Sequence, residues 1–101
     1  MNIGQIIKDR YKILELLGEG GMAFVYKAED KQLKRMVAIK TLKPNYVQQE
    51  TFVERFKREA QTVANLNHPN IVQIFDWGIE DEPFFVMEYI CLLYTSDAAD
   101  E

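Results

Sequence analysis

The sequence has very few side chains that could crosslink the chain or bind a transition metal. Among its 101 residues there is one cysteine, Cys91, and one histidine, His68. A single cysteine cannot form an intrachain disulfide, and one cysteine with one histidine falls short of the four ligands of a structural zinc site. We therefore expect neither a disulfide framework nor a metal centre in this chain.

The chain also lacks an excess of basic residues and any long apolar run. Sixteen Asp and Glu residues outweigh twelve Lys and Arg residues, and the net charge of −4 argues against nucleic-acid binding through a basic surface. No apolar run approaches the ~20 residues of a membrane span, and residues 1–10 lack the apolar core of a secretory signal. We expect a cytoplasmic domain that contacts neither nucleic acid nor membrane.

Short runs of β-branched and aromatic residues predict an antiparallel sheet. Five strands are predicted, over residues 11–18, 23–29, 36–42, 71–75 and 84–89. Residues 3–7 could add a small edge strand. Residues 76–83 contain Asp, Gly and Pro, which favour a turn between the last two strands.

One segment has the helical period instead. Apolar residues recur at steps of three and four from Phe52 to Leu66, which predicts an amphipathic helix. Thr51 and Glu54 have the spacing of a capping box at its start, and residues 67–70 (Asn-His-Pro-Asn) form its stop signal. The predicted fold class is α+β, a five-stranded antiparallel sheet with one long helix packed on it.

Three glycines, Gly18, Gly20 and Gly21, lie between the first two predicted strands. In a hairpin tip such residues leave the backbone accessible, and successive N–H groups can bind phosphate oxygens. Residues 18–23 (GEGGMA) also fit the dinucleotide-binding pattern G-x-G-x-x-G/A. That pattern needs a helix to begin within it, whereas residues 24–26 (Phe-Val-Tyr) predict a strand. A plain glycine-rich turn without a ligand is the third interpretation.

Two charged residues are predicted to face the core. Lys40 lies within an apolar strand, on the same face as Ala38. Glu59 comes three residues after Phe56 and borders the apolar stripe of the helix. An edge-strand lysine that reaches water and a glutamate at the rim are the simpler interpretations. An ion pair would satisfy both charges, and because such a pair adds little net stability, we attribute it to function.

Together these residues resemble the small N-terminal lobe of a eukaryotic-type protein kinase, over about residues 3–90. GEGGMAFV matches the glycine-rich loop, VAIK matches the motif that ends in Lys40, and Glu59 falls at the position of the helix glutamate. Two further stretches match the strand after that helix and the hinge, residues 68–72 and 86–89. The details GGMA-x-VY, RFKREAQ and LNHPNIV are most similar to bacterial serine/threonine kinases, particularly the membrane-anchored type with extracellular PASTA repeats.

The resemblance implies an ATP site. By resemblance, Lys40 holds the α- and β-phosphates and Glu59 holds Lys40 in place, so these two are the implied catalytic residues. The implied nucleotide-binding residues run from the glycine-rich loop to the hinge: Leu17, Gly18, Glu19, Gly20, Gly21, Met22, Ala23, Phe24, Val25, Ala38, Lys40, Met87, Glu88 and Ile90. Ala23 stands in place of the family's third glycine, which we expect only to stiffen the loop tip.

The resemblance also implies partners. Protein substrates and Mg²⁺ would bind through a larger lobe, because no H-R-D-type loop or D-F-G motif follows the hinge here. Residues 76–78 (Asp-Trp-Gly) are similar to D-F-G in outline but precede the hinge. We expect residues 1–101 alone to be inactive. The parent could span the plasma membrane once and dimerise through this lobe.

Two other functions stay open from the sequence. One is a pseudokinase scaffold that binds nucleotide or partners without catalysis, and the other is a free-standing binding domain. In domain terms, residues 1–90 are interpreted as a truncated kinase lobe. Residues 91–101 (CLLYTSDAADE) fit no continuation of that lobe, and we interpret them as translated read-through of a sequencing adaptor.

Overall fold

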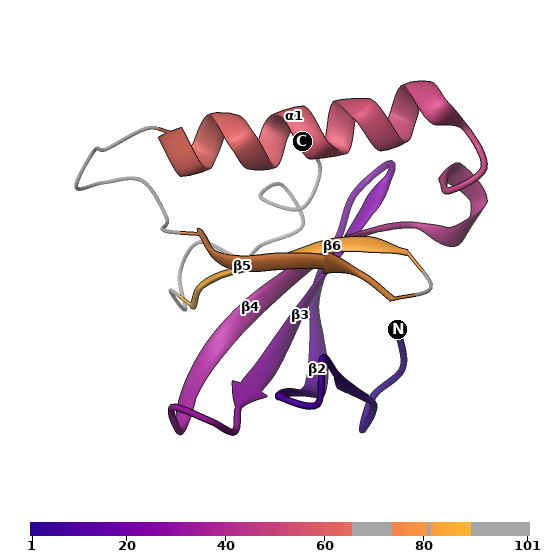
Figure 1. Cartoon of the computed structure of the whole chain (residues 1–101). Helices are drawn as coiled ribbons and strands as arrows, with labels where there is room; N and C mark the ends of the chain where they lie inside the picture. Colours follow the sequence, from indigo (N-terminus) through magenta and orange to yellow (C-terminus); the bar gives the residue numbers. More distant parts are fainter. Residues whose placement is uncertain (66–73, 81, 90–101) are drawn as a thin grey trace.

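The protein forms one curled antiparallel sheet with a long helix lying across it (Figure 1). The computed structural model describes residues 1–65, 74–80 and 82–89. The strand order in the sheet is β1-β2-β3-β4-β6-β5. In chain order the elements are β1 (Ile6–Ile7), β2 (Tyr11–Glu19), β3 (Ala23–Asp30), β4 (Arg35–Leu42), the 3₁₀ helix η1 (Pro44–Tyr46), α1 (Glu50–Asn65), β5 (Ile74–Ile79) and β6 (Pro83–Glu88).

The predicted sheet and helix are confirmed. Strands β2, β3, β4 and β6 agree with their predicted bounds to within one residue at each end. The sheet has a sixth strand, the two-residue β1, in which Ile7 pairs with Tyr11 at the edge. The predicted helix end at 67–70, the start of the fourth strand at 71–73 and residues 90–101 lie outside the described residues.

Alternation along the strands places apolar side chains on both faces of the sheet. One face carries a core that includes Tyr11, Ile39 and Phe84. The other face lies under α1, where Phe56 of the helix packs on Phe85 of β6 with ring centroids 5.1 Å apart. We call this second group the helix-side cluster; its buried members are Val25, Ala38, Leu42, Phe56, Phe85 and Met87.

The turn predicted over residues 76–83 is wrong in its first half, because β5 continues to Ile79. Asp76 and Gly78 are typical turn residues, yet both lie on the half-buried side of this strand. Three large side chains that alternate with them are exposed instead: Phe75, Trp77 and Ile79. From residue 75 to residue 79 the apolar side chains are therefore the exposed ones, a pattern that does not predict a strand.

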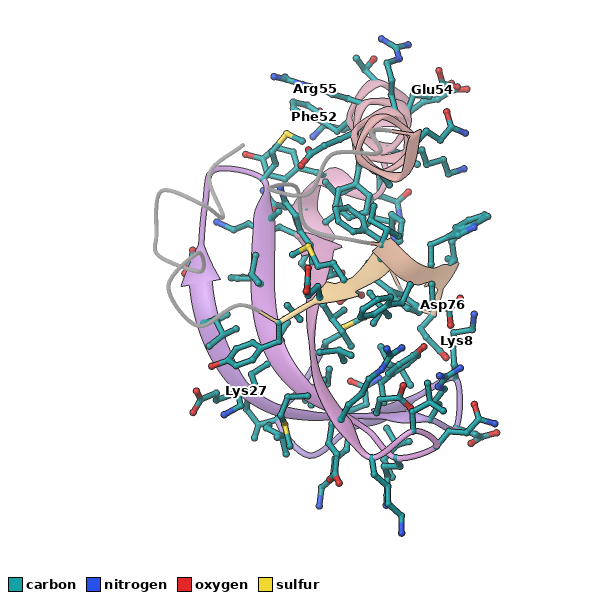
Figure 2. The ribbon with its side chains drawn as sticks, turned by 90° about the vertical axis from the view of Figure 1, so that its left-hand side faces the viewer. Lys8, Lys27, Phe52, Glu54, Arg55 and Asp76 are labelled. Atoms are coloured by element: carbon teal, nitrogen blue, oxygen red, sulfur yellow. The ribbon has the colours of Figure 1, made fainter. Side chains whose placement is uncertain are left out.

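Asp76 is accommodated in the strand because its carboxylate has three hydrogen-bond donors. Lys8 Nζ and the Trp77 N–H donate to Oδ1, each at 2.9 Å, and the Tyr11 hydroxyl donates to Oδ2 at 2.9 Å. Lys8 and Asp76 lie together in Figure 2. Burial disfavours the charged form of this carboxylate, but the three hydrogen bonds outweigh burial and lower the pKa of Asp76.

The helix begins at Glu50, one residue before Thr51, which the predicted capping box placed at the N-cap position. The carbonyl of Gln49 accepts the first helical hydrogen bonds, from the N–H groups of Phe52 at 3.0 Å and Val53 at 3.2 Å. Gln49 is therefore the residue at the N-cap position, and Thr51 lies inside the first turn, where it cannot cap the helix. The outer face is polar, and Glu54 points away from the sheet (Figure 2).

Tyr11 should give the protein a measurable alkaline pH dependence. Burial, and then its hydrogen bond to Asp76, raise the pKa of Tyr11 to about 12. The unfolded chain would lose this proton near pH 10, so the contribution of Tyr11 to the free energy of unfolding is complete below pH 10 and is lost as pH rises toward 12. We expect Tyr11→Phe to be less stable than wild type by about 1–2 kcal/mol at pH 7.

Chemical denaturation of both proteins between pH 7 and pH 11 checks this expectation. The stability gap between wild type and Tyr11→Phe should narrow above pH 10, while other groups that titrate there cancel in the difference. A gap that stays constant across the series would show that the Tyr11 hydroxyl titrates normally in the folded protein.

Candidate functional site

Lys40 and Glu59 form an ion pair between the sheet and the helix. Lys40 lies in the middle of β4, is only 4% exposed, and donates from Nζ to Glu59 Oε1 at 2.5 Å. Because β4 lies between β3 and β6, the interpretation as an edge-strand lysine is excluded. An ammonium group has three donors, so pairing with one carboxylate oxygen leaves capacity for a second anion.

Apolar residues of the predicted nucleotide site gather on the same side of the sheet. Val25, Ala38 and Met87 are buried in the helix-side cluster, and Leu17 packs against it. In register, Val25 lies opposite Lys40, and Ala38 lies opposite Met87. Leu17 is the extra residue of a bulge between Leu16 and Gly18. The structure thus brings an apolar surface next to a buried cation.

The glycine-rich loop closes the β2–β3 hairpin. Glu19 pairs with Phe24, and the Gly20 N–H donates to the Ala23 carbonyl at 2.9 Å. Among the described glycines, only Gly4 has a positive φ, so the turn itself does not require glycine at the loop positions. What glycine adds there is the absence of a side chain, which lets a ligand approach the backbone. Phosphate binding by this loop stays a prediction.

The remaining predicted positions divide between the two faces. Met22 is half-buried against the helix-side cluster. Phe24 packs on the opposite face, with its ring centroid 6.0 Å from that of Tyr26, so only its backbone can face a nucleotide on the helix side. Glu88 ends β6 and is half-buried. Ile90 lies outside the described residues.

Lys43 contacts the loop, although no sequence pattern predicts a role for it. Its Nζ donates to Glu19 Oε2 at 2.9 Å, and its backbone N–H donates to the Met22 carbonyl at 2.8 Å. Lys43 comes after the last residue of β4 and directly before Pro44, a position where neither the strand period nor the helix period predicts the direction of a side chain. Only its contact with Glu19 shows that the Lys43 side chain turns toward the loop.

An apolar pocket of about 240 Å³ lies between α1 and strands β5 and β6, away from the loop. Phe56, Ile74 and Phe85 contribute to its lining. None of its lining residues belongs to the predicted nucleotide set, so this pocket is distinct from the candidate site.

The described residues contain no group of three or more His, Cys, Asp and Glu side chains that could hold a metal ion. Within the same residues, α1 is too short and too polar to cross a membrane, and no other helix could do so.

A curled sheet with one helix, a glycine-rich hairpin and a lysine–glutamate pair define the small lobe of a protein kinase. Residues 11–94 match the protein kinase domain family, and the chain belongs to this family. The serine/threonine-protein kinase PrkC of Bacillus subtilis is 53% identical over 91 residues, which are 89% of this chain and 14% of that protein. A probable serine/threonine-protein kinase of Clostridium perfringens is 48% identical over 89 residues, 87% of this chain and 13% of that protein.

Solved structures agree with this assignment. The kinase domain of Mycobacterium tuberculosis PknI is 28% identical, with a TM-score of 0.69 over 89% of this chain and 36% of that one. The apo form of PpkA-294 is 25% identical, with a TM-score of 0.75 over 88% of this chain and 38% of that one. The chain spans 13% and 14% of the two curated relatives named above, which corresponds to the N-terminal part of a kinase domain.

Proposed function

We propose that this chain is the ATP-binding half of a bacterial serine/threonine protein kinase, whose complete form transfers the γ-phosphoryl group of ATP to protein hydroxyls. The observation that carries the proposal is the ion pair between Lys40, which is buried, and Glu59, which is half-buried. Desolvating such a pair costs about as much as the pairing returns, so stability alone does not account for it. A role in function accounts for the pair, because it would hold a cation in a fixed position beside the ATP phosphates.

The residues present fit ATP. The apolar surface of Leu17, Val25, Ala38 and Met87 suits the adenine ring, and Lys40 suits the α- and β-phosphates. Glu59 orients Lys40 from the helix. The backbone of residues 18–24 would cover the phosphates, and the backbone of Glu88 and Ile90 would hydrogen-bond the adenine edge. ATP supplies the phosphoryl group, and we assign the Mg²⁺ ligands and the catalytic base to the larger lobe.

Protein substrates would reach the site through that larger lobe. We place this lobe in the cytoplasm, in a parent that spans the plasma membrane once, with dimerisation through the small lobe. Residues 1–90 would be the kinase lobe, and residues 91–101 an adaptor-derived tail. A genomic sequence that continues the kinase reading frame through residues 91–101 would contradict the last assignment.

A chimera tests the proposed function. Residues 1–89 would replace the corresponding segment in the kinase domain of the Bacillus subtilis relative, which is 53% identical. With radiolabelled ATP and Mg²⁺, we expect the chimera to label itself or a protein substrate, and residues 1–101 alone to give no turnover. A folded chimera that binds ATP without transferring phosphate would favour the pseudokinase alternative, and turnover by residues 1–101 would contradict the assignment of catalytic groups to the larger lobe.

A further inference from the structure

Lys43 holds the glycine-rich loop from both of its strands. Its Nζ lies 2.9 Å from Glu19 Oε2, at the end of β2. The same Nζ lies 5.1 Å from the ring centroid of Phe24, near the start of β3, which is within the range of a cation–π contact. Its backbone N–H donates to the Met22 carbonyl at 2.8 Å. One residue thus contacts the two strands and the tip between them.

The same strand carries Lys43 and the predicted phosphate-binding lysine. Ala23 pairs with Leu42, and the hydrogen bond from Lys43 to Met22 continues the β3–β4 ladder by one step. Lys40 lies three residues before Lys43. Contacts to Lys43 therefore set the position of the loop relative to Lys40.

The two charges of this contact differ in exposure. The Lys43 side chain is 15% exposed, whereas the Glu19 side chain is 54% exposed. An ion pair that solvent reaches contributes modestly, and salt screens it. The pair is therefore suited to biasing the position of a loop rather than to stabilising the whole fold.

We propose that Lys43 and Glu19 form a latch that holds the glycine-rich loop in the position that receives the ATP phosphates. Lys43 is in this view a positioning residue, which acts through the loop and does not touch the nucleotide. Its catalytic consequence rests on the proposed ATP-binding function, whereas the latch itself is a property of the free chain. Holding a loop in its bound position reduces the ordering cost of binding, so the latch lowers the KM for ATP and leaves kcat unchanged.

Amide hydrogen exchange in residues 1–101 tests the latch without nucleotide. The Gly20 and Lys43 N–H groups are both hydrogen-bonded across the loop, so their exchange rates report loop opening. We expect Glu19→Gln and Lys43→Met each to speed exchange about two- to fivefold at low salt. In 0.5 M NaCl the wild-type rates should rise toward those of the variants.

Charge reversal separates a latch from a simple packing effect. The double variant Glu19→Lys with Lys43→Glu should bring exchange back to within about twofold of wild type. Lys31→Met, on the exposed turn between β3 and β4, is the matched control and should leave loop exchange unchanged. Amides of the β3–β4 ladder report whether each variant is folded. Wild-type rates in both single variants, or no recovery in the reversed pair, would overturn the proposal.

The chimera gives the catalytic readout. Lys43→Met should raise the KM for ATP about two- to fivefold with kcat unchanged. A latch seen by exchange in an inactive wild-type chimera would leave the latch standing and count against the proposed function. Normal activity with an unchanged KM in Lys43→Met would instead overturn the role of the latch in ATP binding.

Discussion

Replacing Lys40 with methionine should lower phosphotransfer by the chimera by about 10²–10³-fold, the typical cost of removing one fixed charge or donor from a transition state. Methionine keeps the length and apolar character of the side chain, so the packing around a residue that is 4% exposed is preserved. What it removes is the ammonium group that we assign to the phosphates.

The measurement is kcat/KM for ATP, with the thermal unfolding midpoint as a check of folding. Glu59→Gln should cause a smaller loss than Lys40→Met, because its amide oxygen can still accept from Lys40 Nζ. Lys57→Met is the matched control, because Lys57 is an exposed lysine on the helix that carries Glu59. The activity of this variant should equal that of the wild-type chimera. A well-folded Lys40→Met chimera with near wild-type activity would remove Lys40 from the proposed site.

Replacing Asp30 with alanine should destabilise the fold by about 3–5 kcal/mol, as expected when one side of a buried ion-pair network is removed. Asp30 is fully buried. Arg10 donates to both of its carboxylate oxygens, at 2.8 and 2.9 Å, and Arg35 donates at 3.2 Å. The backbone N–H groups of Gln32 and Leu33 also donate to Oδ1, at 3.1 and 3.2 Å. Alanine would leave all of these donors without their acceptor.

Urea unfolding at pH 7 measures this loss. Arg35→Ala is the control, because its side chain is 36% exposed and Asp30 keeps its other donors. We expect that control to lose no more than about 1 kcal/mol. An Asp30→Ala protein with wild-type stability would mean that the network is replaceable by water.

The Asp30 network also predicts how stability responds to acid. The hydrogen bond from Arg10 is the largest cause that holds the pKa of Asp30 well below its usual range, with burial opposing it and the N–H of Leu33 and Arg35 assisting. As pH falls below about 4, the unfolded chain therefore binds a proton before the folded chain does. The stabilising contribution is present above pH 4 and is lost in stronger acid. The difference in free energy of unfolding between wild type and Asp30→Asn should therefore shrink as pH falls below about 4.

Several of these features could be predicted from residue patterns. Strands β2, β3 and β4 agree with the bounds predicted from their β-branched and aromatic residues. The alternation of side-chain direction along a strand placed Lys40 on the side of Ala38. The period of α1 placed Glu59 at the edge of its buried stripe. The ion pair between Lys40 and Glu59 follows from these two local facts and the need to satisfy both charges.

Other features could not be predicted, and each involves a partner from elsewhere in the chain. Asp76 looks like a turn residue until Lys8 and Tyr11 are seen to bind it. The inverted hydrophobic pattern of β5 is compatible with a strand only because the sheet supplies the neighbouring β6. Lys43 lies outside the periodic patterns of both strand and helix. Only the packing of the β2–β3 hairpin shows that its side chain contacts Glu19.

By itself, the sequence determined the order of strands and helix along the chain, the glycine-rich hairpin, and the inward direction of Lys40 and Glu59. These features follow from the periods of strands and helices, which are local properties. Only the tertiary structure decided which distant charges meet. Lys40 and Glu59 are 19 residues apart, Lys43 and Glu19 are 24 apart, and Lys8 and Asp76 are 68 apart. Such pairs depend on strand register and on the path of the chain, which no local pattern encodes.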